Sequence, residues 1–195
     1  MKCNKVMINK KEIKKNKNVK NTKIKIQRKT FNIFKVSGKF KLIPLIINIL
    51  IPLVLGFIVS YLNKNSINTY EALRKALFTP PAIVFPIMWG ILYILMGISA
   101  YRIYMKNKKG INDNGAYFIY LVNLIFNLIW IFIFLTFRLY AISFLWISIL
   151  FVLAIITFVK FIRIDKIAGF LLIPYVIWTL FVGVLNYFIW VFNEM

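Results

Sequence analysis

The chain has 195 residues, of which 61% are hydrophobic, and its mean hydropathy of +0.78 predicts an integral membrane protein rather than a soluble domain. Its net charge is +21, with no histidine and one cysteine, Cys3, so the commonest general base is missing and no disulfide can form within one chain. Conventional hydrolytic or metal-dependent catalysis therefore has almost no side chains to use, and we expect neither a metal site nor a resident cofactor.

Residues 1–41 form a basic arm. They hold 15 of the 26 Lys and Arg residues and one of the five acidic residues. The segment lacks the short apolar core and the small-residue cleavage site of a secretory signal, so we expect a disordered arm, or residues added by an upstream start codon. The functional alternative is binding to anionic lipid headgroups, at about 1 kcal/mol for each basic residue near the surface. No nucleic-acid partner is expected, because no folded motif accompanies the charge.

Five uncharged stretches follow the arm, and each is long enough to cross a hydrocarbon core of about 30 Å as a helix. The stretches do not alternate as the strands of a barrel would. The predicted fold class is therefore all-α integral membrane, a five-transmembrane-helix bundle over residues 42–195. We expect the helices at about residues 42–63, 80–105, 114–137, 139–160 and 167–193.

The second stretch opens with Pro80 and Pro81, and proline is tolerated in the first turn of a helix. Pro86 is expected deeper in this helix, where neighbouring helices can satisfy the carbonyl that it frees. One face of the helix carries three aromatic residues at four-residue intervals, Phe85, Trp89 and Tyr93. Such a stripe most often serves helix packing, so a ligand site needs support from other helices.

Two other stretches carry aromatic and amide side chains on one face. The third places Asn123 and Asn127 beside Trp130, and the fifth places Trp178 and Phe181 together. These groups could be contacts that hold helices together. If they converge, they would line an apolar, aromatic pocket with a few hydrogen-bonding groups, which suits a flat hydrophobic small molecule.

The loops differ in charge between the two sides of the membrane. The arm and the loops Arg102–Asp113 and Lys160–Lys166 carry 22 Lys and Arg residues, against four on the opposite side. The positive-inside rule therefore predicts a cytoplasmic N-terminus and an outside C-terminus.

Three ordered blocks of residues carry a family resemblance. The first comprises Tyr70, Leu73, Lys75, Pro80-Pro81, Phe85-Pro86, Trp89, Leu92-Tyr93 and Met96-Gly97. The second comprises Asn127, Trp130 and Phe134. The third comprises Pro174-Tyr175, Trp178, Phe181, Leu185-Asn186 and Asn193. Over residues 42–193 the chain resembles the TspO/MBR family of tryptophan-rich sensory proteins, whose mitochondrial members are called translocator protein or peripheral-type benzodiazepine receptor.

The resemblance implies a five-helix bundle in a bacterial cell membrane, commonly a homodimer, that binds porphyrins such as protoporphyrin IX as ligands rather than cofactors. Some members bind cholesterol or synthetic isoquinoline and benzodiazepine ligands. The implied pocket lies between the helices under the first loop. The implied ligand-binding residues are Phe85, Trp89, Tyr93, Asn127, Trp130, Phe134, Trp178 and Phe181. The implied lid residues are Tyr70, Lys75, Phe78, Pro80 and Pro81.

The chain departs from the family pattern at several positions of the loop and pocket. A Trp of the usual loop motif is replaced by Phe78 and a Pro by Ala76, and Val182 stands where a smaller residue, usually Ala, is common. Ser143 is the nearest polar residue to an Asp that often begins the fourth helix. These changes fall on the expected lid and pocket wall and leave the predicted fold unaffected.

The function expected first is a receptor or sensor that binds porphyrin or a related hydrophobic ligand and regulates tetrapyrrole metabolism or a stress response. One alternative is a light- and oxygen-dependent porphyrin-degrading enzyme, in which Trp89 and Trp178 would lie near the macrocycle. A second is facilitated transport of porphyrin or sterol-like ligands, and a third is a scaffold whose aromatic residues only pack. For the implied homodimer, Gly90, Gly97 and Ala100 offer small residues for close helix contact.

Overall fold

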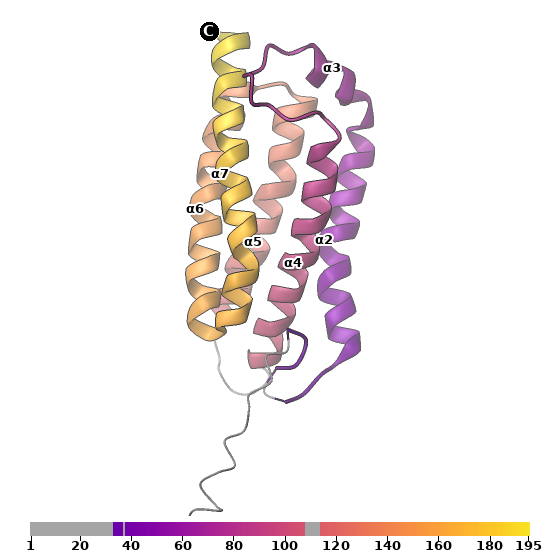
Figure 1. Ribbon diagram of the computed structural model, residues 1–195, viewed down its shortest axis with the longest axis vertical. Helices are drawn as coiled ribbons and strands as arrows, with labels where there is room; N and C mark the ends of the chain where they lie inside the picture. The colour runs from indigo at the N-terminus through magenta and orange to yellow at the C-terminus, as the bar shows by residue number, and fades with distance from the viewer. Residues whose placement is uncertain (1–32, 37, 108–113) are drawn as a thin grey trace, which may run out of the picture. The chain divides into compact units, whose positions relative to one another are not determined.

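The computed structural model describes residues 33–36, 38–107 and 114–195 (Figure 1). The chain divides into two units, residues 1–32 and residues 33–195, and the account below concerns the second. The arm expected to be disordered spans residues 1–41, and its residues 1–32 lie outside the described part of the chain.

Five long helices make up the second unit. They are α2 (Leu42–Leu62), α4 (Val84–Asn107), α5 (Asn114–Ile131), α6 (Tyr140–Ile164) and α7 (Lys166–Glu194). The 3₁₀ turn η1 (Lys64–Ser66) and the short helix α3 (Ile67–Ala72) join α2 to α4, and α5 continues as the π-helix η2 (Phe132–Thr136). Within the described residues, five helices are long and apolar enough to cross a membrane, which confirms the predicted fold class.

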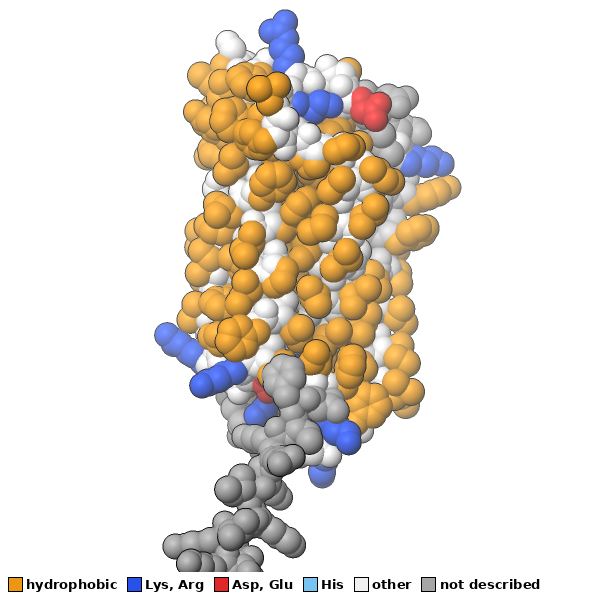
Figure 2. Space-filling model, in the orientation of Figure 1, with side chains coloured by type: hydrophobic (Ala, Val, Ile, Leu, Met, Phe, Trp, Pro, Cys, Tyr) orange, Lys and Arg blue, Asp and Glu red, His pale blue; other side chains and the backbone are white. Residues whose placement is uncertain are grey.

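The outer faces of these helices are apolar. Figure 2 shows hydrophobic side chains along the length of the bundle, with Lys and Arg side chains gathered at its two ends. Ile43 and Phe57 on α2 are each at least 70% exposed, and many other large apolar side chains of the long helices are exposed to a lesser extent. A surface of this kind is stable in lipid and not in water, so the protein is an integral membrane protein.

The start of α4 differs from the prediction. Pro80 and Pro81 precede the helix, in a turn where the Val84 N–H donates to the Pro81 carbonyl at 3.0 Å. Pro86 is the third residue of α4, where an N–H has no helical partner. The prediction that Pro86 lies deep in the helix and frees a carbonyl is therefore wrong, because the helix begins at Val84.

The end of α4 lies two residues beyond the predicted end at about 105, at Asn107, and the helix includes Arg102, which the charge count had assigned to a loop. Arg102 is buried and pairs with Asp165, with Nε to Oδ1 at 3.0 Å and Nη2 to Oδ2 at 2.9 Å. Asp165 also caps α7 by accepting the Ala168 N–H at 3.0 Å. A charge can stay in the helix here because its partner meets it with two parallel hydrogen bonds.

Residues 33–36 and 38–41, which the prediction assigned to the basic arm, make contacts with this end of the bundle. Val36 is fully buried, in a cluster that includes Tyr101 and Met105. The Tyr101 hydroxyl donates to the Phe34 carbonyl at 3.2 Å and accepts the Lys41 N–H at 3.1 Å. The boundary predicted at residue 41 is therefore too late, because apolar and backbone contacts begin near position 33.

Helices α2 and α4 touch at Gly97. A methyl group at this position would lie 2.6 Å from the Ile49 Cα and 2.7 Å from the Asn48 carbonyl oxygen, so only glycine permits the contact. Ala100, one turn on, is fully buried. The prediction that Gly97 and Ala100 offer a surface to a second copy is wrong, because α2 of the same chain covers Gly97 and Ala100 is already enclosed.

Candidate ligand-binding cavity

A cavity of about 500 Å³ lies inside the bundle, at the end that carries α3. Side chains from α2, η1, α3, α4, α5, η2 and α7 surround it, together with residues that precede α4. Most of the wall is apolar or aromatic. The volume of the cavity is within the range of about 300–1,000 Å³ that is usual for small-molecule sites. Polar side chains are few; apart from the tyrosines they are Ser60, Asn63, Lys64, Glu71 and Asn186.

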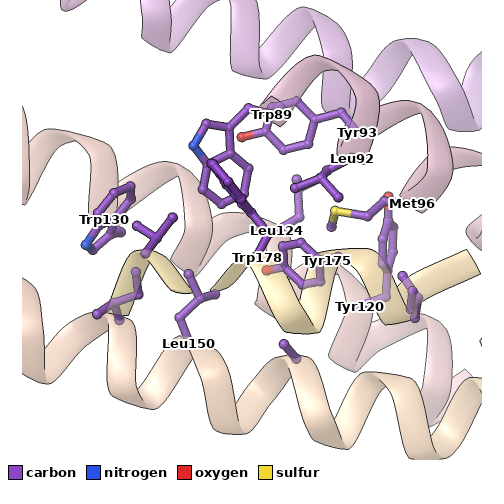
Figure 3. Packing of buried hydrophobic residues seen from close by; sticks show 14 of the residues in the cluster. Trp89, Leu92, Tyr93, Met96, Tyr120, Leu124, Trp130, Leu150, Tyr175 and Trp178 are labelled. Atoms are coloured by element: carbon purple, nitrogen blue, oxygen red, sulfur yellow. The ribbon is translucent and has the colours of Figure 1, made fainter. Parts of the chain in front are cut away.

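Stacked aromatic rings form one side of the cavity. The Trp89 ring stacks on Tyr93 with centroids 5.8 Å apart, and its centroid lies 6.3 Å from that of Trp130. Trp130 in turn stacks on Phe134 at 5.4 Å. Figure 3 shows Trp89, Tyr93 and Trp130 in the buried cluster, with Tyr175 beside them. This wall presents broad, rigid π-faces from two helices.

Two contacts fix the position of Tyr93. Its hydroxyl donates to Asn127 Oδ1 at 2.7 Å, across the space between α4 and α5. On the other side its ring lies against α2, where a methyl group at Gly56 would be only 2.2 Å from Tyr93 Cε2. Tyr93 is thus held between a hydrogen bond and a glycine.

The buried asparagines join helices. Tyr175 donates to Asn123 Oδ1 at 2.5 Å, which ties α7 to α5. Asn186 Oδ1 accepts from Ser143 Oγ at 2.7 Å, and Asn186 Nδ2 donates to the Tyr140 carbonyl at 3.0 Å, which ties α7 to α6. Asn123, Asn127 and Asn186 therefore all make interhelical hydrogen bonds, and Asn186 also reaches the cavity wall.

The structure brings most of the expected ligand-binding residues to the cavity. On its wall are Phe85, Trp89, Tyr93, Trp130 and Phe134. Three others lie off the wall. Asn127 is fully buried and supports Tyr93, while Trp178 packs behind Phe85 at 5.9 Å and against Phe181 at 5.4 Å.

We define the lid segment as residues 70–83. Of the expected lid residues, one lines the cavity and another packs against the end of α7. Tyr70 is on the cavity wall, with its ring 5.4 Å from Phe85 and 6.4 Å from Phe134. Burial raises the pKa of Tyr70 to about 12, so its hydroxyl is protonated at neutral pH. Phe78 packs instead against Phe188 of α7, with centroids 5.6 Å apart.

Lys75 supports the lid from outside the cavity wall. Its Nζ donates to the carbonyls of Tyr70 at 3.0 Å and Glu71 at 3.1 Å, and lies 4.6 Å from the centre of the Tyr70 ring. A cation at the end of a helix stabilises the exposed carbonyls there. Pro80 and Pro81 are likewise off the wall and shape the turn into α4.

The sequence reasoning missed the contribution of α2, and on α7 it expected Val182 at the pocket wall without counting Leu185, Asn186 or Ile189 among the ligand-binding residues. The α2 residues on the wall are Leu53, Gly56, Phe57 and Ser60, and the α7 residues are Val182, Leu185, Asn186 and Ile189. Both sets have helical spacing, but helices that are apolar on all sides give no signal for which face is inside. Val182, larger than the residue usual in the resembled family, occupies volume at this wall.

Several buried polar atoms near the cavity have no hydrogen-bond partner among the described residues. These atoms include the Tyr70 hydroxyl and the indole Nε1 of both Trp130 and Trp178. An unpaired buried donor costs free energy, so such a wall is suited to a ligand that carries acceptors.

The fold and cavity define a class of protein, a five-helix membrane bundle with an aromatic site between its helices and under its first loop. A family model described as the TspO/MBR family matches residues 48–191. The chain belongs to the TspO/MBR family.

Individual relatives agree with this assignment. Protein CrtK of Rhodobacter capsulatus is 35% identical over 127 residues, which are 64% of this chain and 78% of that protein. Tryptophan-rich protein TspO of Archaeoglobus fulgidus is 31% identical over 154 residues, or 78% of this chain and 98% of that protein. The tryptophan-rich sensory protein of Cereibacter sphaeroides is 30% identical over 118 residues, or 60% of this chain and 72% of that protein.

Proposed function

We propose that this protein is a membrane receptor that binds protoporphyrin IX, or a related flat hydrophobic ligand, in the aromatic cavity, and that occupancy regulates tetrapyrrole metabolism or a stress response. The observation that carries the proposal is the continuous aromatic wall of Trp89, Trp130 and Phe134, faced by Tyr70 and Phe85. The name tryptophan-rich sensory protein, given to the Cereibacter relative, agrees with a sensory role.

The physical basis is the shape and polarity of the wall. A macrocycle buries a large apolar area against such rings, and each aromatic contact adds about 0.5–1.5 kcal/mol beyond that burial. The polar side chains at Ser60, Lys64 and Glu71 leave room for a charged substituent at the edge of the ligand. The cavity therefore suits an amphipathic ring system better than a wholly apolar one.

We further propose that the N-terminus lies in the cytoplasm of a bacterial cell, with the cavity toward the outer side, and that the protein forms a homodimer. The positive-inside rule supports the orientation. The dimer contact would use an outward apolar face, because Gly97 is covered by α2. The basic arm would bind anionic lipid headgroups.

A degrading enzyme receives less support than a receptor. That hypothesis needs Trp89 and Trp178 near the macrocycle, and Trp178 lies off the cavity wall behind Phe85. Light-dependent loss of porphyrin absorbance that requires Trp89 would nevertheless favour it. Passage of porphyrin across sealed vesicles would favour transport.

The test is a titration of the detergent-solubilised protein with protoporphyrin IX in the dark, followed by quenching of Trp fluorescence. We expect saturable quenching, and about tenfold weaker binding in Trp89→Leu, which removes one stacking face. Trp190→Leu is the matched control, because it removes one indole that packs on Phe144, away from the cavity. Non-saturable quenching, or equal effects of the two substitutions, would contradict the proposal.

A further inference from the structure

Asn193, near the end of α7, contacts the lid segment through its side-chain amide. The Arg74 N–H donates to Asn193 Oδ1 at 3.0 Å, and Asn193 Nδ2 donates to the Arg74 carbonyl at 2.9 Å. Asn193 Nδ2 also donates to the Ile189 carbonyl at 2.7 Å, which fixes the side chain on its own helix. The amide thus pairs with both backbone groups of one lid residue, as a neighbouring strand would.

The position held by Asn193 is connected to the cavity wall. Arg74 is the second residue after the end of α3, and the N–H of the intervening Leu73 donates to the Tyr70 carbonyl at 3.3 Å. Lys75, on the other side of Arg74, donates to the same Tyr70 carbonyl. Because Tyr70 is part of the wall, a movement of Arg74 away from α7 would move Tyr70 away from Phe85 and Phe134.

Tyr70, Leu73 and Ala82 pack in or against the core cluster, but few contacts hold the part of the lid segment between Arg74 and Pro81. Leu77 is fully exposed, and Phe78 is about half exposed with one aromatic contact, to Phe188. A segment with so little buried apolar surface opens at low free-energy cost. The end of α7, in contrast, is anchored, since the Glu194 carboxylate accepts the N–H groups of Tyr140 and Ala141 at 2.9 Å each. Figure 1 shows the lid segment running at the same end of the bundle as the C-terminus.

We propose that Asn193 is a positioning residue that holds the lid segment closed over the cavity, and that opening of its pair with Arg74 admits and releases ligand. The identity of the ligand rests on the proposed function, whereas the lid movement does not. The residue type matters chemically: aspartate supplies the acceptor without the donor, and leucine, of similar size, supplies neither.

The experiment measures lid position and ligand exchange in the same full-length protein. Spin labels are placed at the exposed positions Leu77→Cys and Ile142→Cys, with Cys3→Ser to remove the native thiol, and their distance distribution is recorded without ligand in lipid nanodiscs. Protoporphyrin IX release is then followed by Trp fluorescence in the dark, with albumin in excess as the acceptor. The variants are Asn193→Leu and Asn193→Asp, and Met195→Ala is the control at a neighbouring, 84% exposed position.

We expect a single short distance in the labelled parent and in the Met195→Ala control. Asn193→Leu should add a longer-distance population and release the porphyrin roughly fivefold to tenfold faster, and Asn193→Asp should lie between. Unchanged distances in both Asn193 variants would overturn the proposal, and so would a longer-distance population with an unchanged release rate. Should Asn193→Leu not fold, Asn193→Asp decides by the same two measurements. Should the parent bind no porphyrin, the proposed function fails, and the distances alone decide the role of Asn193.

Discussion

At the scale of single residues, Gly56 controls how far the Tyr93 ring is from the cavity. Because a methyl group at Gly56 would lie 2.2 Å from the ring, Gly56→Ala must push Tyr93 aside, and the open cavity is the direction available. We expect protoporphyrin IX to bind roughly tenfold more weakly, as measured by fluorescence titration. Gly90→Ala is the matched control, since a methyl group there meets no atom within 4 Å although Gly90 also lines the cavity. Equal losses in the two variants would contradict this explanation.

The hydrogen bond between Tyr93 and Asn127 provides a second test at this scale. Tyr93→Phe leaves the buried Asn127 Oδ1 without its donor, so we expect a loss of about 1 kcal/mol in the free energy of unfolding. Asn127→Leu should cost a similar amount, and the double substitution should cost less than the sum. A double-mutant cycle from unfolding in mixed detergent measures this coupling. Strict additivity would show that the bond contributes nothing.

Residue patterns identified the aromatic wall only in part. The stripe of Phe85, Trp89 and Tyr93 was predictable because Trp and Tyr at helical spacing mark one face of α4. On α7, however, Val182 lines the cavity, whereas Trp178 and Phe181 pack beside the wall without lining it. Spacing gives the set of residues that share a face, but the rotation of an apolar helix is set by the packing of its neighbours.

At the scale of helices, the N-terminus of α6 is capped from the far end of the sequence. Leu139, at the N-cap position, makes no side-chain hydrogen bond, and the Glu194 carboxylate accepts the first two N–H groups of the helix instead. We expect Glu194→Ala to lower the free energy of unfolding by about 1 kcal/mol, from the lost cap and from the lost charge at the helix dipole. Thermal unfolding in detergent checks this, with Met195→Ala as the control. A shift in Tm no larger than that of the control would rule out the cap.

Helix cores were predictable and helix ends were not, for the same reason. Length and hydropathy fix where a helix can cross the membrane, and all five stretches are helices. The ends depend on partners elsewhere in the chain. Arg102 stays in α4 because Asp165 pairs with it, and α6 begins where Glu194 caps it. The partners in these two contacts are 63 and 53 positions apart in the sequence, so the residues around a helix end do not reveal them.

At the scale of the whole molecule, the pair Arg102–Asp165 connects α4 to the junction of α6 and α7. Arg102 Nη1 also donates to the Ile33 carbonyl at 2.5 Å, so the segment before α2 is joined to the same point. Both charged side chains are buried at this end of the bundle, opposite to the cavity end. The pair therefore holds the bundle closed at one end while the lid segment remains the movable part at the other.

The stability of this junction should depend on pH. Burial alone would raise the pKa of Asp165, but hydrogen bonds from Arg102 and Ala168 and the charges of Arg102 and Lys106 hold the pKa below its usual range. A carboxyl with a depressed pKa in the folded state contributes stability above its unfolded pKa of about 3.9, and this contribution is lost as the pH falls through the folded pKa. We therefore expect the free energy of unfolding to decrease as the pH falls below about 5.

Asp165→Asn isolates the pair. At pH 7 we expect it to lower the free energy of unfolding by about 3 kcal/mol, because it leaves Arg102 buried without its counter-charge. Below about pH 4 the difference between the variant and the wild-type protein should shrink, since protonation then removes from wild-type Asp165 the charge that the variant already lacks. Unfolding curves in detergent between pH 3 and pH 7 measure this, with Glu71→Gln as the control at an exposed carboxylate. A difference that stays constant over this range would mean that Asp165 acts through its cap on α7 rather than through its charge.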